Sequence, residues 1–381
     1  MGLHVSQTYS ENIAWTPDHQ ELLDRAKHIA STVFAPNAAK WDQSDASPMV
    51  NIKHLADAGL LGLSTPSAYG GAGAPRSVLR EYTETIAAVC GVTNFLQGQH
   101  QSAASLIASG ENEDLKHGIL PLLARGEALC GVAFAHLRRP GPPTMRAFEV
   151  EDGWVFDGAA PWFTGWGVFS HCMLGGTLTD GRLLFVVIPL AESEHLCASE
   201  PMRLCAMNAS STVSLTCREL RVDRNQYMKT ISREQMARND EAAILVVLPQ
   251  TFSVTSASIA LLRKYLETRH NKRIEAAADA LTEELSRLRS EGARWFDHSI
   301  TQEYKENALR IRAWAIDLGV RAAHAAVIAG GGGANNLGHP AQRLFREAMF
   351  YTLTAQTPDA QAASLNRVAE ISLNQCNPND S

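Results

Sequence analysis

The spacing of apolar residues divides the chain into three zones, and the first of them has a helical period. Between residues 18 and 126, apolar side chains recur every three or four positions, and the segment 22–34 carries one continuous apolar face. This spacing predicts amphipathic helices. Further helical patterns cover 52–58, 77–90 and 97–108, and turns that contain glycine or proline separate them.

The second zone, from about residue 129 to 223, changes to short runs rich in β-branched and aromatic residues. Such runs, bounded by turn residues, predict strands. Asp152 and Gly153 stand between two of the runs, and this dipeptide predicts a tight hairpin. The expected strands are 130–134, 147–151, 153–156, 182–188 and 212–222.

The third zone begins near residue 233, where helical periodicity returns. Apolar residues from Ile274 to Leu288 form one stripe, and 309–329 is apolar on most sides, which predicts a buried central helix. The stretch 242–262 is also apolar, but Pro249 and several hydroxyl residues interrupt it. We expect a pair of buried helices there rather than a membrane span. Helices, then strands, then helices indicate an α+β protein that is mainly α.

Composition excludes some classes of protein but does not indicate a specific function. The 381 residues are 45% hydrophobic and 19% charged, as in ordinary soluble globular proteins, and the net charge of −6 argues against nucleic acid or an anionic membrane as the main partner. Seven scattered cysteines without a CxxC pair suggest neither a metal site nor a disulfide framework. The first 15 residues show no apolar run followed by a cleavage site, so we expect no secretory signal. We therefore expect a cytoplasmic protein.

The segment 330–346 holds the clearest candidate chemistry. Four consecutive glycines precede a polar stretch, and Pro340 suits the first turn of a helix that begins at or just after it. A glycine backbone can approach a ligand closely and adopts positive φ freely. The N–H groups of a helix N-terminus favour anions. Gly331, Gly332 and Gly333 are therefore candidates for holding an anionic cofactor, and tight helix packing is the alternative.

Five segments resemble, in the same order, the motifs of the acyl-CoA dehydrogenase superfamily. Each motif is weakly specific alone, but their shared order makes the resemblance strong from about residue 18 to residue 370. The segments are 59–73 (GLLGLSTPSAYGGAG), 109–127, 131–140 (GVAFAHLRRP), 158–167 (GAAPWFTGWG) and 330–346.

The resemblance implies a fold of three domains, a cofactor and an assembly. We expect an N-terminal helical domain (1–128), a middle antiparallel β-domain (129–232) and a C-terminal four-helix bundle (233–381). The family resemblance also implies FAD, a small-molecule or acyl substrate, and a homodimer or homotetramer formed through the bundle.

Site residues follow from the same resemblance. Phe134, His136 and Leu137 occupy the flavin-facing strand, while Trp162 would pack on the flavin ring and Thr164 would hydrogen-bond its N5 edge. Each of these positions also has a structural interpretation, namely core packing for Trp162 and a satisfied structural histidine for His136.

Further candidates lie outside that region. His100 corresponds to a helix that faces the substrate cavity, and it is the one weak catalytic candidate, although a structural histidine is the more common case. Arg269 matches the arginine that reaches the partner subunit's FAD, and Thr144 is the one hydroxyl left where the family has Gly-Ser-Asp. Arg343 and Arg346 lie three apart on one helix face, where structural ion pairs are expected.

Departures from the family pattern bear on the activity. Ala355 stands where family dehydrogenases carry their late catalytic glutamate, and abstraction of an α-proton needs a positioned base. No Phe-Gly follows Arg269. The resemblance then implies a flavin-dependent oxidoreductase without that glutamate, which binds FAD weakly or uses FMN or reduced flavin. The alternatives are a two-component monooxygenase served by a flavin reductase, and a non-catalytic scaffold protein that has lost its cofactor.

Overall fold

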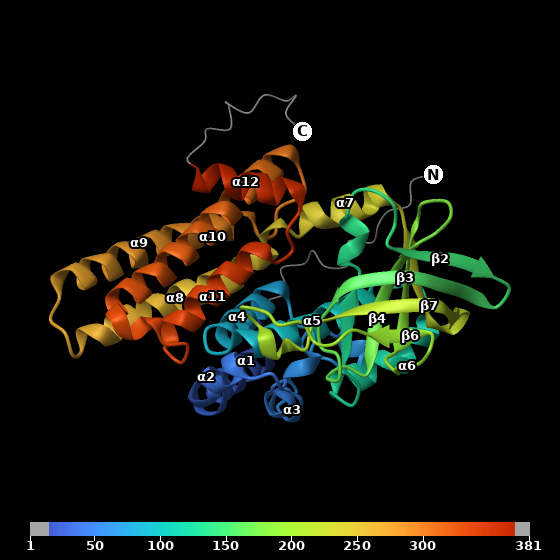
Figure 1. Cartoon of the computed structure of the whole chain (residues 1–381), viewed down its shortest axis with the longest axis horizontal. Helices are drawn as coiled ribbons and strands as arrows, with labels where there is room; N and C mark the ends of the chain where they lie inside the picture. The colour runs from blue at the N-terminus through green and yellow to red at the C-terminus, as the bar shows by residue number, and fades with distance from the viewer. Residues whose placement is uncertain (1–14, 370–381) are drawn as a thin grey trace. The chain divides into compact units, whose positions relative to one another are not determined.

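The computed structural model describes residues 15–369 (Figure 1). The chain separates into two compact units, one that ends at Met236 and one that begins at Ala237. The predicted order of helices, strands and helices is confirmed, and so is the α+β class. The first 14 residues, which bear on a secretory signal, and Cys376 lie outside the described residues.

The first unit begins with a layer of helices, and capping residues mark where two of them start. Thr16 begins α1 with a capping box, because its hydroxyl accepts from the His19 N–H while the His19 ring accepts from the Thr16 N–H. Asn112 caps α6, because its side-chain oxygen accepts from the Leu115 N–H at 3.0 Å. The helices are α1 (Pro17–Ile29), α2 (Ala35–Gln43), α3 (Met49–Asp57), α4 (Arg76–Ala87), α5 (Gly91–Ala108) and α6 (Glu113–Ala124).

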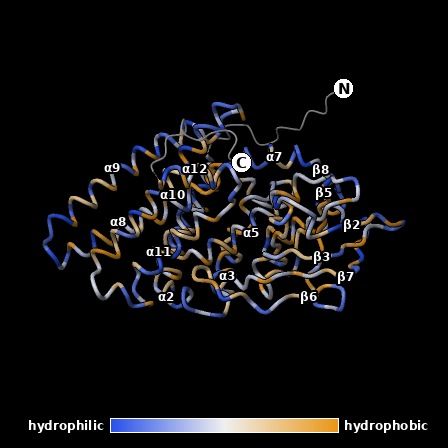
Figure 2. The backbone as a smooth tube through the Cα atoms, turned by 45° about the horizontal axis from the view of Figure 1, so that its top comes forward, coloured by the Kyte–Doolittle hydropathy of each residue, from blue (hydrophilic) through white to orange (hydrophobic). Residues whose placement is uncertain are grey.

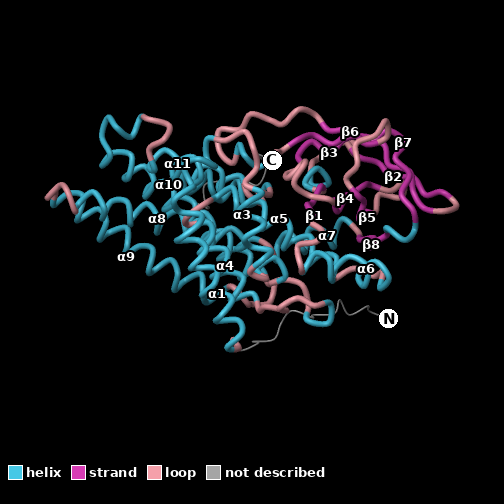
Figure 3. Tube along the Cα trace, turned by 90° about the horizontal axis from the view of Figure 1, so that it is seen from below, coloured by secondary structure: helices cyan, strands magenta, loops and turns pink. Residues whose placement is uncertain are grey.

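One sheet forms the rest of this unit, with the strand order β6-β7-β3-β2-β4-β5-β8 and β1 beside β4 (magenta in Figure 3). The expected hairpin is confirmed, because β2 and β3 pair from Val150 and Gly153 outward. The sheet is mixed rather than purely antiparallel, since β1 runs parallel to β4. The strands are β1 (Cys130–Ala133), β2 (Met145–Val150), β3 (Gly153–Phe163), β4 (His171–Thr177), β5 (Leu183–Pro189), β6 (Leu196–Ala198), β7 (Val213–Asp223) and β8 (Tyr227–Ile231).

Three of these strands, β4, β6 and β8, have no counterpart in the predicted set. In β4 the cause is the pair Gly175 and Gly176, which weakens a strand pattern. A Cβ at Gly175 would lie 2.7 Å from Leu137 Cδ1, and a Cβ at Gly176 would lie 2.6 Å from Phe156 Cε1. Packing against distant segments therefore requires glycine at these two positions. The same glycines weaken the strand pattern, so the sequence did not predict β4.

The second unit consists of helices packed around α10, as predicted for 309–329. α10 contacts α8, α9, α11 and α12, and 13 of its residues are buried. The connection between α8 and α9 is hydrophilic (Figure 2). The helices are α8 (Leu248–Leu266), α9 (Lys272–Trp295), α10 (Gln302–Gly330), α11 (Pro340–Leu353) and α12 (Pro358–Val368), and α7 (Arg233–Ala242) precedes them.

The expected pair of helices within 242–262 is wrong. A short 3₁₀ turn at Ile244–Val247 leads into α8, and Pro249 occupies the first turn of that helix rather than a break between two helices. Proline suits this position because its missing N–H would be unpaired there in any case. Residues Ile244–Leu266 are long and apolar enough to cross a membrane, but 67% of their apolar window is buried inside the protein, as in the core helix of a soluble protein.

Two isoleucines of α10 provide a matched test of this core. Ile311 is fully buried, whereas Ile328 is 69% exposed on the same helix. We expect Ile311→Ala to lower the free energy of unfolding by about 2–5 kcal/mol, because it removes buried methyl groups and leaves a cavity. Ile328→Ala should change it by less than about 0.5 kcal/mol. Urea unfolding followed by circular dichroism measures both, and equal losses would contradict the assigned burial.

Candidate functional site

The end of β3 carries two of the predicted flavin-binding side chains. Trp162 is 49% exposed, while Thr164, just beyond the strand, is 7% exposed. Between Ala160 and Phe163, β3 has one residue more than the β7 segment that it pairs with. Pro161 falls in this bulge, where its missing N–H is tolerated, and bulges re-aim side chains. The bulge leaves Phe163 buried and Trp162 half-exposed, so Trp162 does not fill the core of its unit.

Thr164 belongs to a chain of three buried hydroxyl groups. Its Oγ1 lies 3.2 Å from Thr212 Oγ1, which in turn lies 2.8 Å from Ser210 Oγ. Ser210 and Thr212 are 0% and 3% exposed. The sequence reasoning identified a strand at 212–222 but missed these two partners. The run Ser210-Ser211-Thr212 before that strand was the available signal, but hydroxyl clusters also occur in ordinary turns.

The segment that carries Ser210 is strained and tied down. Met207 and Ser211 have φ of 60° and 51°, in the left-handed region that costs free energy for residues with a Cβ. Asn208 holds the segment in place, because its side chain donates to the Ser44 carbonyl oxygen at 3.3 Å and to Asp45 Oδ1 at 2.9 Å. The Gly165 N–H donates to the Ser210 carbonyl oxygen at 2.9 Å. The segment and the end of β3 are thus locked together.

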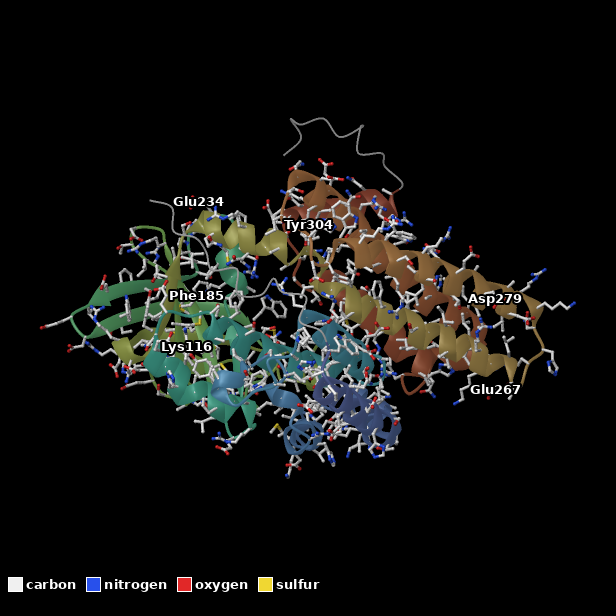
Figure 4. All side chains as sticks on the ribbon, turned by 180° about the vertical axis from the view of Figure 1, so that it is seen from behind. Lys116, Phe185, Glu234, Glu267, Asp279 and Tyr304 are labelled. Atoms are coloured by element: carbon white, nitrogen blue, oxygen red, sulfur yellow. The ribbon has the colours of Figure 1, made fainter. Side chains whose placement is uncertain are left out.

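Phe134, His136 and Leu137 gather beside β4, at the 3₁₀ turn Ala135–Arg138 that follows β1. The His136 Nε2 donates to the Gly175 carbonyl oxygen at 3.0 Å, and burial lowers the pKa of His136 to about 4. Leu137 belongs to the core. The ring of Phe134 is half-buried and meets Phe185 edge to face at 5.8 Å (Phe185 is labelled in Figure 4). The neutral His136 therefore anchors this turn to the sheet.

Thr144 lies just before β2. Its side chain is exposed, and its backbone carbonyl oxygen accepts from the Ala159 N–H at 2.7 Å. The structure thus fixes the Thr144 backbone to β3 and leaves its hydroxyl at the surface.

His100 lies in the interior of the first unit, at 1% exposure. Its Nε2 donates to the Leu123 carbonyl oxygen at 3.2 Å, and its Nδ1 accepts from the Cys130 N–H at 3.4 Å. Burial lowers the pKa of His100 to about 4, so the ring is neutral at pH 7. Both ring nitrogens are engaged by backbone groups, and the ring joins α5 to α6 and β1.

In the second unit, the four glycines follow one another but have different surroundings. A Cβ at Gly330 would lie 3.0 Å from Tyr265 Oη, and Gly331 has φ of 63°. Packing therefore requires glycine at 330, and backbone conformation favours it at 331. Gly332 and Gly333 are exposed, and a Cβ at either would meet no described atom within 4 Å. Neither packing nor conformation within the described chain explains these two glycines.

Arg269 is close in space to the start of this loop. Its Nη1 donates to the Ala329 carbonyl oxygen at 2.8 Å, and its guanidinium lies 5.5 Å from the centre of the Tyr265 ring. A cation at the C-terminal end of a helix satisfies an unpaired carbonyl and complements the helix dipole. Arg269 therefore caps α10.

Ala355 lies in the loop after α11, exposed and with φ of 47°. The buried Arg312 holds this loop, because its Nη2 donates to the Thr354 carbonyl oxygen at 2.5 Å and its Nη1 to that of Ile244 at 3.0 Å. Burial lowers the pKa of Arg312 to about 10, which leaves it a cation at pH 7. A buried cation therefore holds this loop, and position 355 supplies no carboxylate.

The arginines of α11 were expected to form structural ion pairs. Arg343 lies 3.0 Å from Glu347, which is 4% exposed, and the expectation is confirmed for this residue. No group of three His, Cys, Asp or Glu side chains within residues 15–369 could hold a metal ion. None of the cysteines in that range forms a disulfide.

Comparison with known proteins agrees with this architecture. Residues 16–127 match the family described as acyl-CoA dehydrogenase, N-terminal domain. Butyryl-CoA dehydrogenase from Megasphaera elsdenii superposes with a TM-score of 0.80 at 16% identity, over 94% of this chain and 100% of that one. The whole chain therefore has the fold of the acyl-CoA dehydrogenases, and its residues 16–127 belong to the family of their N-terminal domain.

Other matches are named for different activities. A probable acyl-CoA dehydrogenase of Bacillus subtilis is 23% identical over 93% of this chain and 99% of its own length. The 3-sulfinopropanoyl-CoA desulfinase of Variovorax paradoxus is 30% identical, but the match spans 42% of this chain and only 41% of the desulfinase. Dibenzothiophene monooxygenase from Paenibacillus sp. A11-2 has a TM-score of 0.78 at 16% identity, over 95% of this chain and 99% of that one. This fold therefore serves several chemistries.

The buried, neutral His100 predicts acid sensitivity. Its folded pKa of about 4 lies below the unfolded value of about 6.5, so the unfolded chain takes up the proton more readily. The stability that depends on neutral His100 is full above pH 6.5 and is lost as the pH falls toward 4, by up to about 3 kcal/mol.

We therefore expect His100→Gln to lose less stability than the unaltered protein between pH 7 and pH 5 in urea unfolding. His117→Gln, at an exposed position of α6, is the control and should leave the loss unchanged. An unaltered acid sensitivity in His100→Gln would show that this ring is not the group that titrates.

Proposed function

We propose that this protein is a flavin-dependent oxidoreductase of the acyl-CoA dehydrogenase fold, acting on a small or acyl-type organic substrate. The observation that carries the proposal is the end of β3, where the half-exposed indole of Trp162 stands two residues from the Thr164 hydroxyl. A bound flavin would supply hydride transfer or, when reduced, reaction with oxygen.

The residues of the first unit fit a flavin ring. An aromatic face with 49% exposure can pack against a planar ring, and a hydroxyl beside it can donate to a ring nitrogen or carbonyl oxygen. Among the described residues of this unit no Asp or Glu is buried, so no buried carboxylate opposes the negative charge that a flavin ring gains on reduction. Trp162 and Thr164 are thus the residues that we expect to hold the ring.

The second unit, taken by itself, gives weaker support for a loop that binds a phosphate group of a cofactor. Gly332 and Gly333 are exposed, and no contact or backbone angle in the described chain calls for glycine at either position. Their backbone N–H groups carry no side chain that would keep a phosphate group away. Arg269, in contrast, is engaged as the cap of α10. We therefore infer that the phosphate end is held mainly by backbone groups, and that FAD, FMN and reduced flavin must each be tested.

Ala355 favours a reaction that does not depend on the late glutamate. A methyl group cannot accept a proton, so a dehydrogenase activity would need its base elsewhere. Glu81 of α4 is one carboxylate that could replace the late glutamate as the base. It forms an ion pair with Lys27 at 2.7 Å, and this contact does not favour a role as the base. A two-component monooxygenase, supplied by a flavin reductase, is the second candidate. It needs no such base, and the Paenibacillus monooxygenase shares the fold.

The assembly and location follow from the same proposal. We infer a homodimer or homotetramer, because the C-terminal helices expose apolar side chains, with Ile328, Leu365 and Val368 at 69%, 61% and 75% exposure. The free thiol state of the described cysteines suits a reducing cytoplasm.

Trp162 and Phe148 give a matched test of ring binding. Both are exposed aromatic residues of the same sheet, at 49% and 39%. We expect Trp162→Ala to weaken flavin binding roughly tenfold through loss of stacking and apolar contact, whereas Phe148→Ala should leave the Kd unchanged. Absorption titrations with FAD, FMN and their dithionite-reduced forms measure the Kd.

The same titrations decide between the function classes. Failure of the unaltered protein to bind any of the four flavins at micromolar concentration would support the scaffold alternative and defeat the proposal. If a flavin binds, substrate-dependent bleaching without oxygen indicates a dehydrogenase. A requirement for both oxygen and a reductase indicates a monooxygenase.

A further inference from the structure

The chain Ser210–Thr212–Thr164 is closed at one end. Ser210 is completely buried, and Thr212 Oγ1 is the one partner of its hydroxyl within the described residues. Thr212 contacts Ser210 and Thr164, and Thr164 Oγ1 contacts Thr212. Thr164 is the most exposed of the three, at 7%, and it lies two residues after the half-exposed Trp162. The chain thus runs from the interior to the proposed ring site.

Counting protons fixes the direction of these hydrogen bonds. Three hydroxyl groups carry three protons, but they form only two contacts with one another. If Thr164 donated inward, either the Ser210 proton or the Thr212 proton would be left without an acceptor in a site that water does not reach. A buried, unpaired donor costs about 1–3 kcal/mol. In the favoured arrangement, Ser210 donates to Thr212, Thr212 donates to Thr164, and the Thr164 proton points outward.

We infer that Ser210 and Thr212 are positioning residues that orient Thr164 as a hydrogen-bond donor toward an acceptor atom of the bound flavin. This inference rests on the proposed function, and it names residues that act through Thr164 without touching the ring. Successive hydroxyl groups also polarise one another, so the outward donor is stronger than an isolated threonine.

The surrounding backbone holds the chain of hydroxyl groups in place. Ser211 keeps its strained φ of 51° between the two inner members, and the Trp166 N–H donates to its carbonyl oxygen at 3.1 Å. The Gly165 N–H donates to the Ser210 carbonyl oxygen, so the residue after Thr164 is fixed to the innermost member. A strained segment held this firmly is typical of a preorganised site.

A double-mutant cycle tests whether Thr212 acts through Thr164. Thr164→Val and Thr212→Val replace each hydroxyl with a methyl group of similar size, and each should raise the Kd for flavin roughly two- to tenfold. The double variant should bind no more weakly than Thr164→Val alone, because Thr212 then has nothing to orient. Thr212→Ser should restore binding. Ser210→Ala should weaken binding less than Thr212→Val, since Thr212 still reaches Thr164.

Two further readouts separate this role from a general loss of structure. The visible absorption band of the bound flavin should shift alike in Thr164→Val and Thr212→Val, because both lose the same donor. Thr216→Val, on β7 but outside the hydroxyl chain, should change neither the spectrum nor the Kd. If Thr212→Val does not fold, Thr212→Ala takes its place in the cycle.

The possible results are distinct. The positioning role would be overturned if Thr212→Val raised the Kd by the same factor in the unaltered protein and in Thr164→Val. The proposed function would still stand. Absence of flavin binding by the unaltered protein would overturn both.

Discussion

The pairing of β3 with β7 sets the geometry on which the candidate site depends. β3 pairs with β2 on one side and with β7 on the other, so it is held along both edges. Two irregularities interrupt its register with β7. One of them contains Glu219 on β7, with φ of 49°, and the other contains Pro161 and Trp162 on β3. Because a bulge re-aims side chains, the second irregularity gives the indole its exposed position.

The same pairing brings two distant parts of the sequence to one place. Phe163 and Val213 are register partners, so the residues just beyond them, Thr164 and Thr212, come within hydrogen-bond distance. Gly165 follows Thr164 with φ of 91°, and a Cβ there would lie 2.3 Å from Phe169 Cε2. The turn after β3 therefore requires glycine both for its conformation and for its packing. Sheet register, glycine and strained loop together fix the position of the Thr164 side chain.

The sequence predicted those features that repeat along the chain or that are encoded locally. The central helix within α10, the helix start at Pro340 and the hairpin before Gly153 follow from periodicity and turn chemistry. What the sequence did not reveal depends on contacts between distant segments. The glycines in β4 are required by contacts with Leu137 and Phe156, and Thr212 reaches Thr164 only through the register between β3 and β7. Neither contact leaves a trace in local spacing.

The loop at Ala355 keeps a left-handed backbone without a carboxylate at that position. Alanine in the left-handed region costs about 1 kcal/mol or more, so other contacts must sustain the conformation. Arg312 supplies them, because its buried guanidinium binds the carbonyl oxygen of Thr354, the residue just before Ala355. Hydrogen bonds from a charged donor are the stronger kind. The shape of the loop therefore does not depend on a carboxylate at position 355. A proton-abstraction reaction in this protein consequently needs an acceptor from another residue, from the substrate or from solvent.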